Sequence, residues 1–433
     1  MRNPLTASLD VIAPPRLGRS FRWLFASALI TNIGDGVALA AGPLLVASQT
    51  RDPLLVAMAA LAQTVPVLLF GFAAGVVADR VDRRRMIAVV NLARAAVLAV
   101  LAATILGDVV NIGVVLGSLF LLGTTETFAD VGGASLLPRL VRREDLGIAN
   151  SRLQGAVLLT NQLVAPPIGA LLFAVGMALP FVADAAGFAL GAILVMRIVY
   201  TQGRGTGVAA EAGVGAAKAE SRNWRADMAE GLRWLLAHAP MRTLALTIIA
   251  FNVTFGAAWS VLVLYAQERL GMNEVGFGLI TTAMAIGGII GTVSYGRLER
   301  RFSLANIMRV GLLIETATHL VLALTTLPAV ALVTFVVFGA HAFVWGTTAT
   351  AIRQRAVPDE LLGRVTGVYH VGVMAGMVVG TPIGGLLARN YGITAPFWFG
   401  FVGSAILVTV MWRQFDKIVH AGDAVAHGAS PER

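Results

Sequence analysis

The 433-residue chain contains no cysteine, and charged residues make up only 13% of it. Without cysteine there can be no disulfide framework, no thiol nucleophile and no cysteine-ligated metal site. A soluble domain carries about 25% charged residues, so this chain has about half the charge needed to cover a water-facing surface. The scarcity of charge, together with 57% hydrophobic residues and a mean hydropathy of +0.78, predicts a protein embedded in a bilayer.

Long apolar runs divide the chain into spans. A membrane helix needs about 20 mostly apolar residues, and this rule predicts twelve spans. They cover 22–47, 54–78, 86–107, 111–136, 147–174 and 177–199 in the first half, and 243–267, 275–296, 305–325, 329–351, 362–388 and 394–413 in the second. We therefore expect an all-α membrane protein with a six-helix bundle over 22–199 and another over 243–413.

Polar segments make up the rest of the chain: tails at 1–21 and 414–433 and a central linker at 200–242. The first tail has no apolar core, so it is not a cleavable secretory signal. In the linker, 203–220 is rich in Gly and Ala and is expected to be flexible. The stretch 223–239 has apolar residues at helical spacing, which predicts an amphipathic helix on the inner membrane surface. We expect this helix to couple the two halves mechanically, with partner binding as the alternative.

The positive charges predict the orientation. Of the 33 Lys and Arg residues, 27 fall in the tails, the linker and the loops on one side, and three fall in the loops on the other side. Such an asymmetry marks the cytoplasmic side, so both termini are expected in the cytoplasm. The net charge of +9 and the pI of about 10.8 then reflect membrane insertion. We expect no nucleic-acid partner, because the charges are spread over seven separate segments.

The two halves match at a fixed offset of 216 positions. The residues that recur are Gly75, Arg84, Val141, Glu144, Gly147, Pro166 and Gly169, which correspond to Gly291, Arg300, Val357, Glu360, Gly363, Pro382 and Gly385. The matches fall at corresponding helix ends, which argues against chance similarity between Gly- and Ala-rich helices. Because six is an even number of spans, the two copies have the same orientation. Parallel repeats of this kind are typical of secondary transporters that bind substrate near the bilayer midplane.

The loop after the second span reads Gly75-Val-Val-Ala-Asp79-Arg80-Val-Asp82-Arg83-Arg84-Arg85. It resembles the signature loop of the major facilitator superfamily, in which Gly stands at the position of Asp82. The variant with Asp resembles the drug, macrolide and siderophore exporter branch, also called transmembrane secretion effectors. Further segments that resemble this branch are Gly34-Asp35, Leu136-Leu137-Pro138 and Val357-Pro358-Asp359-Glu360, so the resemblance covers nearly the whole chain.

The resemblance implies a cytoplasmic gate built on this loop. Asp79 would pair with the N-terminal end of span 11 and with an arginine below span 4, for which Arg139 is the candidate. Gly75 would let another helix approach closely. The arginines Arg80, Arg83 and Arg84 would hold the loop at the anionic inner surface. The alternative is that the loop serves only as an insertion signal.

Span 5 contains a proline motif. The sequence around Pro166 and Gly169 resembles the exporter-associated pattern Gly-Pro-x-x-Gly-Gly, with Ala165 and Ala170 in place of two glycines. Proline removes a backbone hydrogen bond and kinks a helix. The equivalent kink residues of the second half are Pro382 and Gly385. The motif favours export over uptake.

Five acidic residues fall within spans, and each is a functional hypothesis because burying an ionisable group in a membrane costs free energy: Asp35, Glu126, Asp130, Asp184 and Glu315. Counting about 1.5 Å per residue places Glu126 about 15 Å and Asp35 about 20 Å from the inner boundary. The family resemblance places spans 1 and 4 beside the central cavity. Asp35 and Glu126 are therefore the candidates for proton coupling.

The other ionisable residues of the spans are expected to be structural. Arg94 and Asp130 lie at similar depth in consecutive spans, which predicts an ion pair. Asp184 and Glu315 lie on spans that the resemblance places at the periphery, where helix-to-helix hydrogen bonds are expected. No spacing links the intramembrane histidines as metal ligands, so they are expected to be packing residues, and no metal site is predicted: His319, His341 and His370.

Polar and aromatic residues on the expected cavity helices are candidate substrate contacts. They are Asn32, Gln63, Asn161, Gln162, Asn252, Phe255, Trp259, Trp345 and Tyr369. An aromatic, weakly polar cavity suits amphipathic or cationic drug-like molecules. Each of these side chains can equally be part of the packing between helices.

Together these features predict a monomeric exporter of the bacterial cytoplasmic membrane that expels a drug, antibiotic or siderophore in exchange for protons. The partners expected are the small-molecule substrate, protons and membrane lipid, and no cofactor is expected. No Walker A pattern is present, so ATP is not the direct energy source. An importer of a nutrient or siderophore remains the alternative. A membrane-embedded enzyme or receptor is the remote one, since no His-Glu-x-x-His or Gly-x-Ser-x-Gly pattern occurs.

Overall fold

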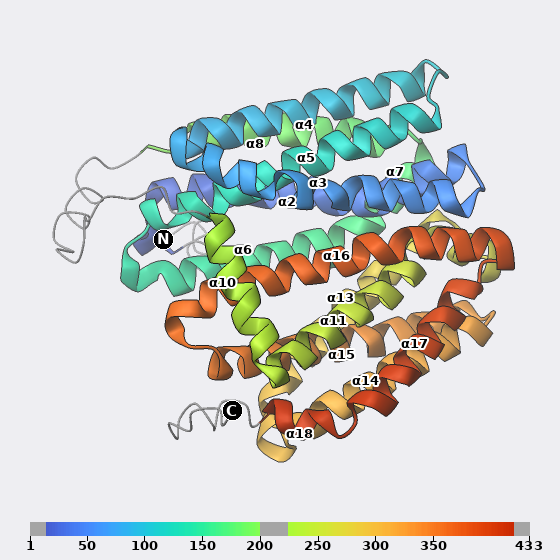
Figure 1. Cartoon of the computed structure of the whole chain (residues 1–433). Coiled ribbons are helices and arrows are strands. Elements are labelled where there is room, and N and C mark those ends of the chain that lie inside the picture. Colours follow the sequence, from blue (N-terminus) through green and yellow to red (C-terminus); the bar gives the residue numbers. More distant parts are fainter. Residues whose placement is uncertain (1–13, 200–223, 420–433) are drawn as a thin grey trace, which may run out of the picture. The chain divides into compact units, whose positions relative to one another are not determined.

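The computed structural model describes residues 14–199 and 224–419, and the stretch 203–220 expected to be flexible lies outside them. Within the described residues every regular element is a helix (Figure 1). The first half contains η1 (Pro15–Leu17), α2 (Gly18–Gln49), α3 (Pro53–Arg80), α4 (Arg83–Leu106), α5 (Ile112–Leu136), η2 (Leu137–Arg139), η3 (Arg143–Asp145), α6 (Leu146–Val157), η4 (Leu158–Val164), α7 (Ala165–Val175) and α8 (Leu179–Met196).

The second half contains α10 (Trp224–Ala237), α11 (Ala239–Trp259), α12 (Leu262–Leu264), η5 (Tyr265–Arg269), α13 (Glu274–Arg301), α14 (Leu304–Leu324), α15 (Pro328–Ala356), α16 (Asp359–Tyr391), α17 (Ala395–Met411) and α18 (Gln414–Val419). Eleven helical segments of the described chain are long and apolar enough to cross a membrane. The segment predicted as the twelfth span forms α17, an apolar helix of 17 residues.

Local sequence signals set the helix ends. Asp82, Asn111, Asn273 and Ser303 each precede a helix and accept a hydrogen bond from a backbone N–H of its first turn. These short polar side chains satisfy donors that have no partner within the helix. Proline stands in the first turn of α11, α15 and α17, where its missing N–H costs nothing.

At the position of the kink predicted in span 5, the α-helix is interrupted by a π-helical segment. A π-helical segment, η4, separates α6 from α7, and Pro166 and Pro167 follow directly in the first turn of α7. Proline has no N–H to donate to the preceding turn, so the regular hydrogen-bond ladder cannot run through this point. A π-helical turn is one of the few recognised causes of a bend within a membrane helix.

Contacts divide the described chain into two compact units. Unit 1 holds 14–50, 62–199 and 277–282, and unit 2 holds 51–61, 224–276 and 283–419. In unit 1, α2 packs on α7 and α8, and α4 packs on α5 and α8. The equivalent pairs form in unit 2, where α11 packs on α16 and α17, and α14 packs on α15 and α17. The internal repeat predicted from the 216-residue offset therefore has a counterpart in the pairing of helices within each unit.

Parts of both predicted tails are structured. Leu17, in η1, and Phe21, in the first turns of α2, are buried in the core of unit 1. At the other end, residues 414–419 form α18 rather than a tail, and Phe415 and Ile418 are buried in the core of unit 2. The sequence rule for spans missed α18 because six residues with two buried apolar side chains are too short to register as a hydrophobic run.

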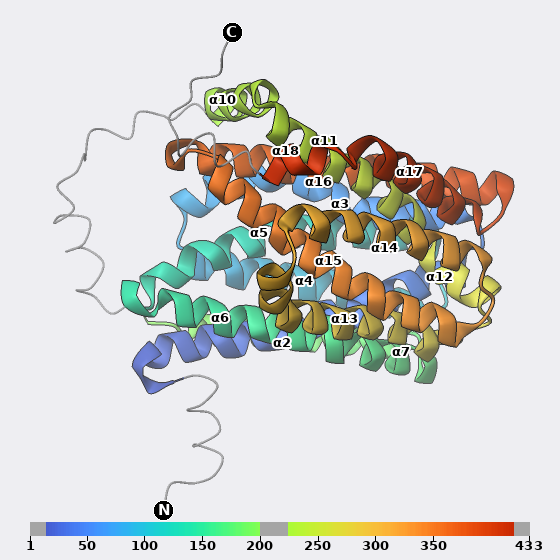
Figure 2. The ribbon, with the colours of Figure 1, turned by 90° about the horizontal axis from the view of Figure 1, so that it is seen from below.

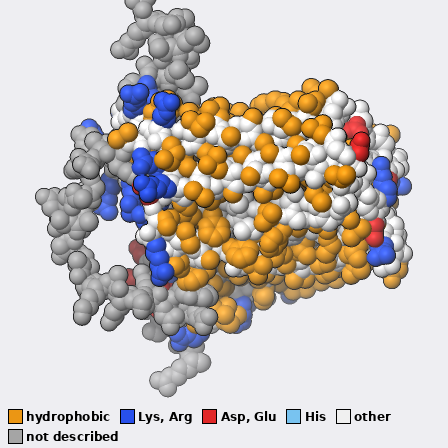
Figure 3. Space-filling view, turned by 90° about the horizontal axis from the view of Figure 1, so that it is seen from above, with side chains coloured by type: hydrophobic (Ala, Val, Ile, Leu, Met, Phe, Trp, Pro, Cys, Tyr) orange, Lys and Arg blue, Asp and Glu red, His pale blue; other side chains and the backbone are white. Residues whose placement is uncertain are grey.

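Apolar side chains cover much of the exposed surface. Figure 3 shows hydrophobic side chains along the visible flank, with Lys and Arg gathered toward its ends. On α4, for example, Val89, Val100 and Leu106 are all exposed. Large contiguous apolar surfaces of this kind are unfavourable in water and mark contact with lipid. The surface agrees with a membrane-spanning chain.

Candidate functional site

The centre of unit 1 holds one arginine between two carboxylates. Arg94, on α4, donates from Nη2 to Oδ1 of Asp35 on α2 at 2.8 Å, and the same nitrogen lies 3.7 Å from Oε2 of Glu126 on α5. The Arg94 side chain is only 5% exposed, against 21% for Asp35 and 51% for Glu126. Its guanidinium also stacks over the ring of Phe188, 4.4 Å from the centroid. We call Arg94, Asp35 and Glu126 the Arg94 cluster.

Two further carboxyl groups surround the Arg94 cluster. Asp130, one turn from Glu126 on α5, acts electrostatically on Asp35 and Glu126, and Asp184 on α8 acts on Asp35. Asp184 is buried, and its Oδ2 has no hydrogen-bond partner in the described chain. One guanidinium cannot neutralise four carboxylates in a membrane interior, because like charges that close repel strongly.

Arg94 forms an ion pair as predicted, but its partners are not the predicted residue, Asp130. Within the described residues the ion pairs of Arg94 are with Asp35 and Glu126. Asp130 instead lies exposed on α5. Counting residues along two helices gave the depth of these side chains to within a turn. It could not give the rotation of each helix about its axis, which decides whether Glu126 or Asp130 faces α4.

The loop between α3 and α4 is organised by local contacts. Asp82 accepts a hydrogen bond from the N–H of Arg85 at 3.0 Å, so it caps α4. Asp82, which stands where the family pattern has glycine, therefore has a structural role. Arg84 donates to the carbonyl of Ile198 at 2.6 Å. Arg80, at the end of α3, is exposed.

The gate residues of this loop differ from the expectation in two respects. Asp79 is 83% exposed, and the ion pair the structure gives it is with Arg83, at 3.7 Å, rather than with Arg139. Arg83 lies only four residues further along the chain, so it reaches Asp79 without any long-range arrangement. A Cβ added at Gly75 would meet no atom within 4 Å, so no helix of unit 1 approaches closely there.

Close backbone packing does occur between α2 and the broken span 5. A Cβ added at Gly36 would collide with the carbonyl of Asn161 in η4, and one added at Gly169 would collide with the carbonyl of Val37. Glycine is required at both places because the backbones touch directly. These contacts hold α2, which carries Asp35, against η4 and α7. In unit 2, Pro382 lies inside α16, and Gly385, almost one turn further along, is buried.

The amide candidates are largely satisfied by their own helices. Asn32 donates to the carbonyl of Ala28, and the buried Asn252 donates to that of Ile248. Gln63 is half-buried on α3, and Asn161 and Gln162 are half-buried in η4. Of this group, Gln63, Asn161 and Gln162 have no side-chain hydrogen bond within the described chain, so their amides are the ones available to a ligand.

The aromatic candidates of unit 2 form a stack. Phe255 of α11 stacks on Trp259 at 5.3 Å and on Phe338 of α15 at 5.6 Å between ring centroids. Phe251 stacks on Phe255 at 6.2 Å and on Trp345 at 6.3 Å. We call these five side chains the aromatic stack. Tyr369 lies apart from it, under the guanidinium of Arg353 at 4.3 Å.

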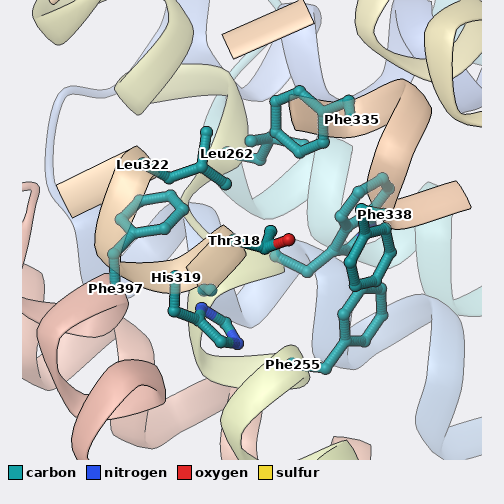
Figure 4. Close-up of a pocket in the computed structure, with 10 residues that line it drawn as sticks. Phe255, Leu262, Thr318, His319, Leu322, Phe335, Phe338 and Phe397 are labelled. Carbon is teal, nitrogen blue, oxygen red and sulfur yellow. The ribbon is translucent and has the colours of Figure 1, made fainter. Parts of the chain in front are cut away.

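A small cavity adjoins the aromatic stack (Figure 4). Phe255, Phe335, Phe338 and Phe397 surround it, with His319 on one side. Its volume of about 20 Å³ is enough for one water molecule and far too small for a drug-sized ligand. The cavity is therefore not itself a drug-binding pocket, and a substrate would meet the exposed edges of the half-buried rings instead.

The predicted amphipathic helix is present as α10, which lies against α11 and α16 (Figures 1 and 2). Arg364 of α16 pairs with Asp227 at 3.0 Å and with Glu230 at 2.7 Å. Gly231 lies against the backbone of Arg364, where a Cβ would come within 2.8 Å. The acidic face of α10 is therefore bound to the protein.

Glu315 makes a helix-to-helix hydrogen bond, as predicted, but its partners are histidines that were predicted only to pack. Glu315 contacts His319 of its own helix and His341 of α15, and all three are buried. The signals that could have found this cluster are the i, i+4 spacing of Glu315 and His319 and a histidine in the next span. Within the described residues no group of His, Asp and Glu has the geometry of a metal site.

Comparison with known proteins identifies the family of this chain. The family model described as transmembrane secretion effector matches residues 11–430. The multidrug efflux pump Tap of Mycolicibacterium fortuitum is 29% identical over 391 residues, covering 86% of this chain and 90% of that protein. Tap of Mycobacterium tuberculosis is 28% identical over 396 residues, covering 88% and 89%.

Solved transporters have the same fold. A bacterial homologue of the iron transporter ferroportin, in its inward-facing state, matches with a TM-score of 0.69 at 19% identity, covering 93% of this chain and 98% of that one. A bacterial homologue of the human lysosomal transporter Spinster matches with a TM-score of 0.70 at 14% identity, covering 97% and 100%. The chain is an integral membrane protein of the bacterial inner membrane with a major facilitator fold.

Proposed function

Because the chain belongs to the transmembrane secretion effector family, we propose that it exports hydrophobic or amphipathic drug-like molecules in exchange for protons. The Tap relatives are multidrug efflux pumps, and they align over most of both chains. Both observations support export over uptake. The proline-associated break in span 5 supports the same direction.

The Arg94 cluster carries the proposal for proton coupling. Four carboxyl groups act on one another around a single buried guanidinium. Such a site binds a proton readily, because each proton relieves repulsion among carboxylates in a medium of low dielectric constant. Glu126, the most exposed member of the Arg94 cluster, is the group best placed to exchange a proton with water or with a cationic substrate.

Alternating access follows from the repeat. We propose that the bundles over 22–199 and 243–413 rock about a substrate site near the midplane, as in other transporters built from parallel repeats. Asp79 and Arg139 would form part of a gate on the side where most Arg residues lie. That side is the cytoplasm by the distribution of positive charge, which puts both termini inside the cell.

The substrate class is proposed from the side chains available. Phe255 and Trp259 offer half-buried ring faces, which bind flat aromatic and cationic groups. Gln63 and Gln162 offer amides for a few hydrogen bonds. The ring faces of unit 2 therefore favour a lipophilic organic cation as the substrate class.

The test is efflux of ethidium and a panel of drugs from cells that express the wild type, Asp35→Asn or Glu126→Gln, with and without an uncoupler. We expect wild-type efflux to stop when the uncoupler collapses the proton gradient, and both variants to export at least tenfold more slowly. Glu299→Gln is the matched control, because it removes a half-buried carboxylate that pairs with Arg355, outside the Arg94 cluster. Normal efflux by both variants, unaffected by the uncoupler, would refute proton coupling.

A further inference from the structure

In the described part of unit 2, a buried carboxylate is held only by histidines. Oε1 of Glu315 lies 3.0 Å from Nε2 of His319, and Oε2 lies 3.3 Å from Nε2 of His341. The Glu315 side chain is 0% exposed, and both imidazoles are buried. We call these three side chains the Glu315 cluster. Its members come from α14 and α15, in a different unit from the Arg94 cluster.

Among the described residues, none places a fixed positive charge against the Glu315 cluster. α11 presents Phe251 to His341 and α15 presents Phe338, while α17 presents Gly400 to His319. Tyr265 of η5 is titratable, and its hydroxyl donates to the carbonyl of Leu322. Arg309, on α14, pairs with Asp416 instead. The negative charge of Glu315 can therefore be balanced only by a proton on one of the histidines.

Two charge states of the Glu315 cluster compete. With both imidazoles neutral and donating from Nε2, the cluster has a net charge of −1, which is unfavourable in a membrane interior. A proton added at Nδ1 makes the cluster neutral. However, the Nδ1 atoms of both histidines are buried without a hydrogen-bond partner in the described chain, so an added N–H there is unsatisfied. Neither state is fully satisfied, which allows a proton to be gained and lost.

The Glu315 cluster also touches the aromatic stack. His341 makes edge contacts with Phe251 at 6.4 Å and with Phe338 at 6.0 Å, and both rings belong to the stack. His319 and Phe255 both line the water-sized cavity shown in Figure 4. A positive charge on His341 would occupy these rings and repel a second cation stacked on them.

We propose that the Glu315 cluster is a second proton-binding site, and that a proton bound there weakens the binding of a cationic substrate to the aromatic stack. The inference rests on the proposed efflux function for its role in transport. Competition of this sign is what an antiporter requires, because the proton and the drug then occupy the protein in alternation. By linkage, a bound drug expels the proton to the same degree.

The first experiment counts protons and is independent of transport. Purified full-length protein in detergent is titrated between pH 8.5 and 5.5, and proton uptake is compared between the wild type and Glu315→Gln. We expect the variant to take up about one proton fewer per chain, since imidazoles without their carboxylate stay neutral. Glu299→Gln, the same change at a half-buried carboxylate that pairs with Arg355, is expected to match the wild type. Equal uptake by Glu315→Gln and the wild type would overturn the inference.

The second experiment measures the coupling. Ethidium binding to the purified wild type should weaken at least fivefold between pH 8 and pH 6, and His341→Gln should lose most of this dependence. His319→Gln serves as a second variant if Glu315→Gln does not fold, and thermal melting identifies the folded proteins. A pH dependence equal to that of the wild type in folded His341→Gln would overturn the inference. If an uncoupler had no effect on wild-type efflux, the proposed function would be refuted. The proton count would still test whether the Glu315 cluster binds a proton.

Discussion

Nη2 of Arg94 lies 2.8 Å from Oδ1 of Asp35, and this contact joins the third span to the first near the centre of unit 1. The same nitrogen reaches Glu126 of the fourth span at 3.7 Å. Three helices therefore meet at one buried guanidinium. The arrangement makes their packing sensitive to the charge on the two acids.

Asp35 is expected to matter more for stability than Glu126. Asp35→Asn leaves a buried guanidinium without its closest counter-ion, and a hydrogen bond to a charged group contributes about 1.5–3 kcal/mol. Glu126 is half-exposed and more distant, so Glu126→Gln should cost less than about 1 kcal/mol. Thermal unfolding of the purified variants measures the difference. Equal melting temperatures for the two variants would contradict the geometry.

The close contact between α2 and α7 makes a second prediction. Gly169→Ala forces a methyl group against the carbonyl of Val37, and overpacking of this kind typically costs about 1–3 kcal/mol. Gly155→Ala, in the same span, is the control because its Cβ would meet no atom within 4 Å. We expect a lower melting temperature for Gly169→Ala alone. A comparable loss in both variants would indicate that helix packing at Gly169 is not the cause.

The ion pairs of Arg364 are expected to hold α10 in place. The chain has no cysteine, so Leu235→Cys introduces a single thiol at a buried position of α10. Adding Arg364→Gln removes the ion pairs with Asp227 and Glu230 and should increase the rate of maleimide labelling at least fivefold. Arg233→Gln, which removes an exposed arginine of α10, should leave the rate unchanged. Slow labelling in the Arg364→Gln background would show that the ion pairs do not hold the helix.

A fall in pH should weaken the docking of α10 against α11 and α16. Burial lowers the pKa of His238, whose ring stacks on Trp234 at the end of α10. A lowered pKa means that the docked state binds the proton less tightly than the undocked state, so docking weakens as the pH falls through the ordinary histidine value. Labelling of Leu235→Cys should therefore accelerate between pH 7.5 and pH 5.5. Adding His238→Phe, which keeps the ring stack, should remove this acceleration, and an unchanged pH response would refute the assignment.

Much of the fold was predictable because membrane helices are specified by length and hydrophobicity. The span rule located the helices from α2 to α17, and the 216-residue offset predicted equivalent pairs such as α2 with α8 and α11 with α17. The span rule missed α18, in which the buried apolar side chains are Phe415 and Ile418. Six residues do not produce a hydrophobic run.

The site was harder to predict than the fold. Depth along the membrane follows from counting residues, and it brought Arg94, Asp130 and Glu126 to nearly the same level. The rotation of each helix is set by close contacts such as that of Gly169 with Val37, which a single sequence does not reveal. For the same reason His319 and His341 were predicted to be packing residues, and the helix-to-helix hydrogen bond predicted for Glu315 had no named partner, although the structure joins the three into one cluster.

The central claim is that protons bound near Arg94 are exchanged for substrate. The most direct test adds ethidium to purified wild-type protein in a weakly buffered detergent solution and records the pH. We predict that ethidium binding releases protons from the wild type. The double variant Asp35→Asn, Glu126→Gln should release at most half as many protons per ethidium bound. Binding without proton release in the wild type, or equal release by the double variant, would contradict the account.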